Sequence, residues 1–281
     1  MSPSSPNDLP RGKLRVDLRP GSVTLARRPS LIGTRLQPLH GVEVEQDEVP
    51  EHPSDPWRAA VDTLAGILGR GRKRPSELEV VVSSHFVRYA LVAWSENLVR
   101  DAERLAFARL AFRDVYGNLV DHWEICLDDQ PAGHPALACA MDRELLAAIR
   151  DVAIGSGVRL QAVTPALSDC FNRHRRMFKS REFCLANVEP GRVTFGFRGG
   201  AGWRAVRSRR MEGPLPESLP TLLKQEASAS GVQEGGALYL CAPRGQDRAS
   251  VLVPGWKVVF LPEADSAPAP VMEPALVSMG S

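Results

Sequence analysis

Asp17-Leu-Arg-Pro-Gly-Ser-Val-Thr-Leu25 returns later in this chain as Asn187-Val-Glu-Pro-Gly-Arg-Val-Thr-Phe195, with Pro, Gly, Val and Thr at matching positions. In each segment, strand-forming residues flank the Pro-Gly pair. Proline presets φ at the first central position of a turn, and glycine tolerates the positive φ that a type II turn requires at the second. The sequence therefore predicts two β-hairpins, with Gly21 and Gly191 at positive φ. Because hairpins with such turns look alike, a chance likeness also accounts for the match when it is taken alone.

The elements after the two hairpins also correspond. In each half a third strand, a helix and a further strand follow in that order, and the first helix begins at Asp55-Pro56, an N-cap residue followed by proline at the first helical position. The expected ranges are an extended run near 31–44, a helix through Leu68 and a strand over 78–93 in the first half, and 202–210, 216–230 and 237–241 in the second. Match and order together favour an internal duplication.

The remaining segments complete an alternating pattern. Strands are expected near 122–127, 159–163 and 257–261, and helices near 96–116, 142–153 and 165–177. Strands that alternate with helices are typical of an α/β protein whose helices cover mixed sheets.

Two βββα halves in a chain of 281 residues resemble the actin-like ATPase superfamily. The resemblance implies an α/β, actin-like fold of two ribonuclease-H-like subdomains, each a mixed β-sheet flanked by helices, with the second one shortened. We expect a disordered tail over 1–12, the first subdomain over 13–178, the second over 179–262 and a Pro/Ala-rich disordered tail over 263–281.

The same resemblance directs attention to the hairpin tips, because actin-like ATPases place them against nucleotide phosphates, typically with an Asp-x-Gly pattern. Here the corresponding positions are Asp17 and Gly21 in the first half and Asn187 and Gly191 in the second. A proline precedes each glycine and removes an N–H that could bind phosphate, and Asn187 stands where a second acid is expected. We therefore expect degenerate nucleotide loops, no cofactor and no catalysis. The alternative is an ATPase or kinase relative that binds ATP-Mg through the Asp17 hairpin.

A more particular resemblance begins at Val80-Val-Val-Ser-Ser-His-Phe-Val-Arg-Tyr-Ala-Leu-Val-Ala-Trp94 and continues through the long helix to Tyr116-Gly117, with Thr164-Pro165 and Asn172 further on. These segments resemble the actin-like assembly proteins of bacterial type IV pili (PilM and its relatives in mannose-sensitive haemagglutinin pilus systems) and the cytoplasmic domain of the L subunit of type II secretion.

This second resemblance spans about residues 13–260 and implies a non-catalytic cytoplasmic scaffold, peripheral to the inner membrane. Its implied partners are an inner-membrane pilus or secretion subunit and the assembly ATPase. By analogy with the family, the first hairpin and its sheet edge would receive a peptide from the membrane subunit.

Composition narrows the function classes. The 35 Lys and Arg residues against 33 Asp and Glu leave a formal charge of +2, so bulk electrostatics does not favour nucleic-acid or membrane affinity. Five cysteines are widely spaced without a CxxC pair, and six histidines show no ligand spacing, so we expect a reducing compartment and no metal site. No apolar segment approaches the roughly 20 residues that cross a bilayer, which predicts a soluble cytoplasmic protein. Cys126 and Cys241 lie in apolar strands and are expected to be inert core residues.

Two groups of residues are candidates for partner binding. Phe86, Arg88 and Trp94 share one parity along the expected strand 78–93, and Arg173 and Arg176 belong to a basic run at the junction of the halves. The alternatives are core packing for the aromatic residues and a solvated surface for the arginines. Nucleic-acid binding through the basic run would predict strongly salt-dependent retention on heparin or DNA, but no stacking motif accompanies it.

Overall fold

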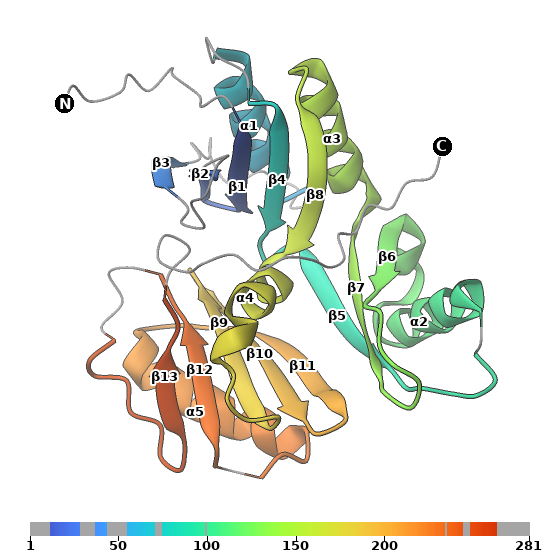
Figure 1. Cartoon of the computed structure of the whole chain (residues 1–281), viewed down its shortest axis with the longest axis vertical. Coiled ribbons are helices and arrows are strands. Elements are labelled where there is room, and N and C mark those ends of the chain that lie inside the picture. The colour runs from blue at the N-terminus through green and yellow to red at the C-terminus, as the bar shows by residue number, and fades with distance from the viewer. Residues whose placement is uncertain are drawn as a thin grey trace. The chain divides into compact units, whose positions relative to one another are not determined.

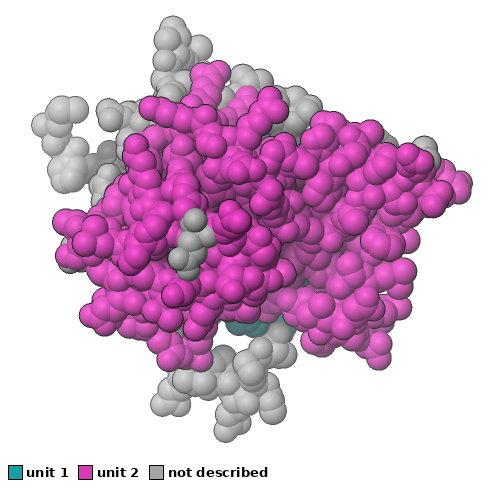
Figure 2. Space-filling model, turned by 90° about the horizontal axis from the view of Figure 1, so that it is seen from below, with its two compact units in different colours: residues 1–87, 141–166, 264–281 teal, residues 88–140, 167–263 magenta. Residues whose placement is uncertain are grey.

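The computed structural model of this chain describes residues 12–28, 37–43, 55–70, 75–98, 100–233, 235–243 and 248–262. The tails predicted at 1–12 and 263–281 lie outside this part of the chain, apart from Gly12. The described residues form two compact units, one from residues up to 87 together with 141–166, the other from 88–140 together with 167–262 (Figure 2). The predicted subdomains 13–178 and 179–262 stay a prediction.

The first unit is built on a five-stranded mixed sheet in the order β3-β2-β1-β4-β8. Its strands are β1 (Lys13–Arg19), β2 (Ser22–Arg28), β3 (Gln37–Glu43), β4 (Glu77–Val82) and β8 (Arg159–Pro165). Helices α1 (Arg58–Arg70) and α3 (Arg143–Gly155) pack against each other and against the sheet (Figure 1). The apolar stripe expected in the first helix is confirmed, because Val61, Leu64 and Leu68 are buried.

The second unit contains an equivalent sheet in the order β11-β10-β9-β12-β13. Its strands are β9 (Phe183–Glu189), β10 (Arg192–Gly199), β11 (Gly202–Arg210), β12 (Ala237–Cys241) and β13 (Lys257–Phe260). Helix α5 (Leu215–Ala229) covers one face, where its Leu219 and Leu223 join Phe195 and Phe197 in a buried core. Helix α4 (Ala166–His174) and the short 3-10 helix η2 (Arg175–Met177) lie on the other face (Figure 1).

The two sheets share strand order and strand direction, as an internal duplication requires. In both, the first strand is antiparallel to the second and parallel to the fourth. Asp17 pairs with Thr24 in the first hairpin and Asn187 pairs with Thr194 in the second, so even the register of the repeat is kept. The predicted hairpins and the shortened second half are therefore confirmed, since no helix joins β12 to β13 among the residues described between them.

The first half carries an insertion between β4 and α3, which belongs to the second compact unit. It comprises β5 (Val87–Val92), α2 (Asp101–Tyr116), the 3-10 helix η1 (Gly117–His122), β6 (Trp123–Leu127) and β7 (Ala136–Asp142). Its strands form a three-stranded sheet in the order β5-β7-β6, and Phe112 and Ile125 lie in its own buried core.

Three local predictions need correction. The run 78–93 is two strands, because Ser83 closes a turn: its Oγ accepts from the His85 N–H at 3.2 Å and its carbonyl accepts from the Phe86 N–H at 3.0 Å. Strand β7 was not predicted, since its alanines carry little β propensity. Gly191 has φ +70° as expected, whereas Gly21 lies outside the positive-φ region, because Pro-Gly also fits turns that need no such φ.

Candidate functional site

The first hairpin tip presents a carboxylate that is already paired. Nη2 of Arg15 donates to Oδ1 of Asp17 at 2.8 Å, and the two side chains are 4% and 18% exposed. Arg15 and Asp17 alternate with Leu14, Val16 and Leu18, so the pair lies on the face of β1 opposite those buried side chains. The Leu18 carbonyl at the end of the strand accepts from the Ser83 N–H at 2.9 Å.

The ion pair between Arg15 and Asp17 disfavours a magnesium ion at Asp17. A guanidinium keeps its charge at every physiological pH, so Arg15 cannot release Asp17 by losing a proton. A magnesium ion held by Asp17 would lie beside that buried positive charge, and Pro20 offers no N–H to a phosphate at the tip. Sequence reasoning missed Arg15, although its i, i+2 spacing to Asp17 places the two side chains on one face.

The strand residues that lead into the second hairpin turn are buried and polar, whereas Pro190 and Gly191 in the turn itself are exposed. Asn187 and Glu189 are 6% and 2% exposed, and Nδ2 of Asn187 donates to Oε2 of Glu189 at 3.4 Å. Burial lowers the pKa of Arg192 across the turn, and Arg88 of β5 lowers it further, whereas Glu189 raises it. The strand ends that flank this turn thus carry charged groups that interact with one another and with Arg88 of β5, within one unit.

At neither hairpin tip is glycine required to avoid a steric clash. A Cβ added at Gly21 or Gly191 would meet no described atom within 4 Å, so only the positive φ of Gly191 demands glycine. The first hairpin also offers no free sheet edge: β2 pairs with β3 and β1 pairs with β4. The peptide site expected at this hairpin and its sheet edge stays a prediction, and the edge strand beside the hairpin is β3.

The predicted partner-binding aromatic residues do not share one strand face. Phe86 precedes β5 and is 7% exposed, whereas Trp94 follows β5 and is 45% exposed. Arg88 lies within β5 near Arg192. Of the three, Trp94 is the one whose ring is open to a partner.

Arg173 and Arg176, the predicted basic pair, differ in burial and in their partners. Arg173 in α4 forms an ion pair with Asp169 one turn earlier at 2.7 Å, with both side chains largely buried. Arg176 in η2 is exposed. Arg173 therefore has a structural role that the sequence did not predict, and the alternative of a solvated surface fits Arg176.

Sequence reasoning missed an aromatic cluster that holds α4 and η2 on the second sheet. Phe171 lies 5.0 Å from Trp203 and 5.4 Å from Phe178, measured between ring centroids, and the Arg198 guanidinium lies 5.2 Å from the centroid of Phe171. The indole of Trp203 lies against Gly196, where an added Cβ would come within 2.6 Å of the ring. These contacts join residues far apart in sequence, so no local pattern predicts them.

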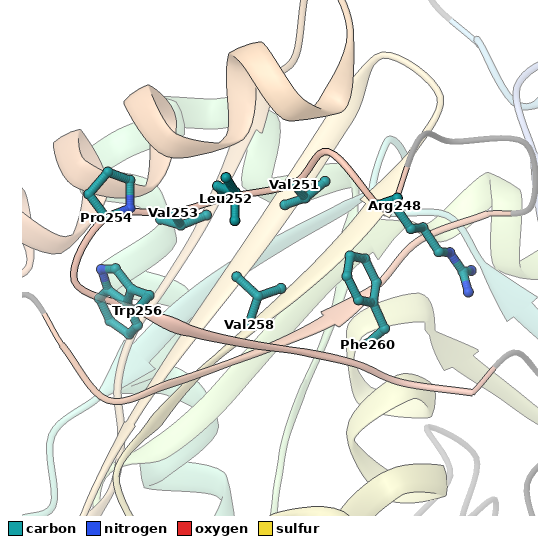
Figure 3. Close-up of a pocket in the computed structure, with 9 residues that line it drawn as sticks. Arg248, Val251, Leu252, Val253, Pro254, Trp256, Val258 and Phe260 are labelled. Carbon is teal, nitrogen blue, oxygen red and sulfur yellow. The ribbon is translucent and has the colours of Figure 1, made fainter.

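A second missed feature is an apolar depression of about 550 Å³ beside β13 (Figure 3). Its lining residues are Arg248, Ala249, Val251, Leu252, Val253, Pro254, Trp256, Val258 and Phe260. Exposed apolar side chains also occur on α2 and η1, namely Phe107, Leu110, Val115 and Leu119.

The described residues contain no cluster of three or more His, Cys, Asp or Glu side chains that could hold a metal ion. All five cysteines are free thiols, and Cys126 and Cys241 are partly exposed rather than core residues. Burial raises the pKa of the Cys126 thiol to about 12, with Asp128 and Glu124 adding to the effect. Within the described ranges no helix has both the length and the apolar character to span a membrane.

Solved structures share this architecture at low sequence identity. A chain of a PilM-PilN type IV pilus biogenesis complex matches with 13% identity and a TM-score of 0.61, over 88% of each chain. A Bacteroides thetaiotaomicron protein with an actin-like ATPase fold and unknown function matches with 11% identity and a TM-score of 0.58, over 89% of this chain and 90% of that one.

The cytoplasmic domain of EpsL, an inner membrane component of the type II secretion system of Vibrio cholerae, matches with 12% identity and a TM-score of 0.53, over 89% of each chain. These likenesses confirm the predicted α/β, actin-like fold and the structural resemblance to pilus and secretion assembly proteins. No family model and no curated protein matches the sequence.

Proposed function

We propose that this actin-like chain is a non-catalytic scaffold of a type IV pilus or type II secretion-like assembly system. It would act at the cytoplasmic face of the inner membrane and link a membrane subunit to the assembly machinery. The fold supports this role, because two of the similar structures belong to such systems.

The observation that carries the proposal is the ion pair between Arg15 and Asp17. A nucleotide site of the actin-like kind needs the tip carboxylate for magnesium or its water shell. Here that carboxylate is paired with the buried guanidinium of Arg15, so a magnesium ion would have to compete with Arg15 for it. The hairpin therefore suits a structural role. We infer that the chain acts by binding protein partners.

A titration with labelled ATP and Mg²⁺ tests the non-catalytic part. We expect no saturable binding tighter than about 100 μM. The alternative, an ATPase or kinase relative, predicts tighter binding that Asp17→Asn abolishes, and that result would overturn the proposal. Asp17→Asn keeps an oxygen that can accept from Arg15, so loss of binding would report the missing charge rather than unfolding.

Crosslinking in the native cell tests the partner. The tagged full-length chain, crosslinked before lysis, should be recovered with an inner-membrane pilus or secretion subunit. Trp94→Asp should reduce that recovery about tenfold, as loss of an aromatic anchor does at interfaces, whereas Val115→Asp serves as the exposed control. Recovery with metabolic enzymes alone would contradict the proposal.

A further inference from the structure

The apolar depression beside β13 lies on the same face of the second sheet as α5. Val251 and Val253 of its wall belong to the buried core that α5 completes, and Val258 and Phe260 pack against that core. Trp256, Val258 and Phe260 alternate along the β13 region and line one side of the depression, and the segment through Val251 and Pro254 lines the other (Figure 3).

The duplication shows what occupies the corresponding place in the first sheet. There, β8 is the counterpart of β13, since each is parallel to the fourth strand of its sheet and lies at the sheet's outer edge. Helix α3 leads into β8 and packs beside α1, the counterpart of α5. In the second sheet the chain runs from β12 to β13 without a described helix, and the depression lies where α3 would lie.

Helix α3 also shows the chemistry that such a place accepts. Its buried residues are Leu145, Leu146, Ile149 and Ala153, an aliphatic stripe at helical spacing. The depression offers the matching surface, with aliphatic and aromatic side chains around a volume of about 550 Å³. Leu252 at its wall is 78% exposed, so part of this apolar surface faces solvent in the chain by itself.

We propose that the depression beside β13 is a docking site for an amphipathic helix of a partner protein, which takes the place that α3 fills in the first half. The helix would insert aliphatic side chains at i, i+3 or i+4 and i+7 between the 251–254 segment and β13. Arg248, whose guanidinium lies 5.8 Å from the centroid of the Phe260 ring, puts a positive charge at one end of the site.

The sequence argues against the chain's own C-terminal segment as the occupant. Residues 263–281 contain Pro268, Pro270 and Pro274, and proline in a helix interior breaks the hydrogen-bond ladder. In a second copy α1, α3 and α5 already bury their apolar stripes within their own units, so the helix left to dock is α2, whose Phe107 and Leu110 are exposed. The sedimentation measurement below tests that occupant. The residues that line the depression include none of the hairpin-tip residues, so the inference stands whether or not the chain binds nucleotide.

A helix-stapled, fluorescein-labelled peptide with the sequence of residues 143–155 provides the probe. We expect saturable binding to the full-length chain, measured by fluorescence anisotropy, with a Kd tighter than about 100 μM. Leu252→Asp should weaken binding about tenfold or more, because it would bury an unpaired charge against the helix. Val115→Asp, at an equally exposed residue of α2, should leave the Kd unchanged.

Four results would overturn the proposal. The first is no saturable binding by the wild-type chain, and the second is equal binding by Leu252→Asp. The third is about tenfold tighter binding by a chain ending at Pro262, which would identify the C-terminal segment as the occupant. The fourth is a dimer that Leu252→Asp converts to a monomer in sedimentation, which would identify a second copy. Thermal unfolding of each variant checks that its fold is intact.

Discussion

Arg15 and Asp17 form an ion pair across two positions of one strand, with Nη2 and Oδ1 2.8 Å apart. Strand periodicity places both on the face of β1 opposite Leu14 and Val16, and the parallel register sets Arg15 beside Glu79 of β4. The hairpin that bears the nucleotide acid in actin-like ATPases thus contains, in this chain, a buried cation that needs that acid. Asp17 is therefore expected to contribute to the stability of the fold.

Asp17→Ala should lower the free energy of unfolding of the chain by about 1–3 kcal/mol, because the buried guanidinium loses one of its acceptors while Glu79 stays close. Urea denaturation followed by circular dichroism measures the effect. The double variant Arg15→Met/Asp17→Leu should recover most of the loss, since it removes both charges. A double variant less stable than Asp17→Ala would contradict the pairing.

Gly196 should not tolerate a side chain. Its Cβ would lie 2.6 Å from Trp203, whose ring is held by Phe171 and is 4% exposed. Gly196→Ala should therefore destabilise the chain by about 1–3 kcal/mol, the usual range for overpacking. Gly200→Ala is the matched control, because its Cβ meets no described atom within 4 Å, and it should change stability by less than about 0.5 kcal/mol. Equal stabilities for the two variants would show that Trp203 moves freely.

Two neighbouring arginines of β11 should differ sharply in their effect on stability. Arg209 donates to Glu226 of α5, a residue that is 3% exposed, whereas Arg210 pairs with Glu212 and both of those side chains are about 80% exposed. Arg209→Ala should destabilise the chain by about 1–3 kcal/mol, because it leaves a buried carboxylate. Arg210→Ala should have an effect below about 0.5 kcal/mol, as exposed ion pairs do. Paired chemical denaturation curves decide the matter, and similar losses would count against the burial argument.

Cys126 should react slowly although its side chain is partly exposed. Burial raises the pKa of its thiol to about 12, so almost no thiolate exists at pH 8. We expect iodoacetamide to alkylate Cys126 at least about 100-fold more slowly in the native chain than in urea, followed by peptide mass spectrometry. Rapid native labelling would overturn the expectation that this cysteine is inert.

The features that the sequence predicted well are those set by neighbouring residues. The Pro-Gly pairs at Pro20 and Pro190 located both hairpins, and the stripe from Val61 to Leu68 located α1. The break at Ser83 was missed because a serine turn within an apolar run leaves the apolar pattern intact. Strand pairing was equally hidden, so the sequence could not tell that β3, rather than the hairpin itself, forms the sheet edge.

In the candidate sites too, the sequence predicts the features set by local pattern and misses those set by burial and long-range packing. The hairpin-tip residues could be named from the repeat, but the use of Asp17 by Arg15 depends on burial, which one sequence does not give. The depression beside β13 adjoins a connection from β12 in which the described residues form no helix, and its likeness to the place of α3 becomes visible only when the two sheets are compared. Long-range packing, such as Arg198 on Phe171, has no counterpart in local spacing.

His174 of α4 is buried between two carbonyl groups. Its Nδ1 lies 2.9 Å from the Cys170 carbonyl and its Nε2 lies 2.8 Å from the Pro262 carbonyl. A neutral imidazole has one N–H, so it can donate to one of the two, whereas the imidazolium could donate to both. Burial lowers the pKa of His174, and the carbonyl contacts raise it; the burial effect prevails, so the folded chain favours the neutral ring.

This balance predicts the direction of the pH dependence. The pKa of the unfolded histidine is about 6.5 and that of the folded one is lower, so below pH 6.5 the unfolded chain binds the additional proton. The stability that the neutral ring contributes is complete above about pH 6.5 and is lost as the pH falls through that value, at up to about 1.4 kcal/mol per pH unit. His174→Gln keeps a hydrogen-bond donor but does not titrate. Urea unfolding at pH 7.5 and 5.5 should therefore show a larger loss on acidification for the wild type than for His174→Gln, and the exposed His122→Gln control should follow the wild type. If the wild type instead gained stability relative to His174→Gln at pH 5.5, the two carbonyls would be holding an imidazolium.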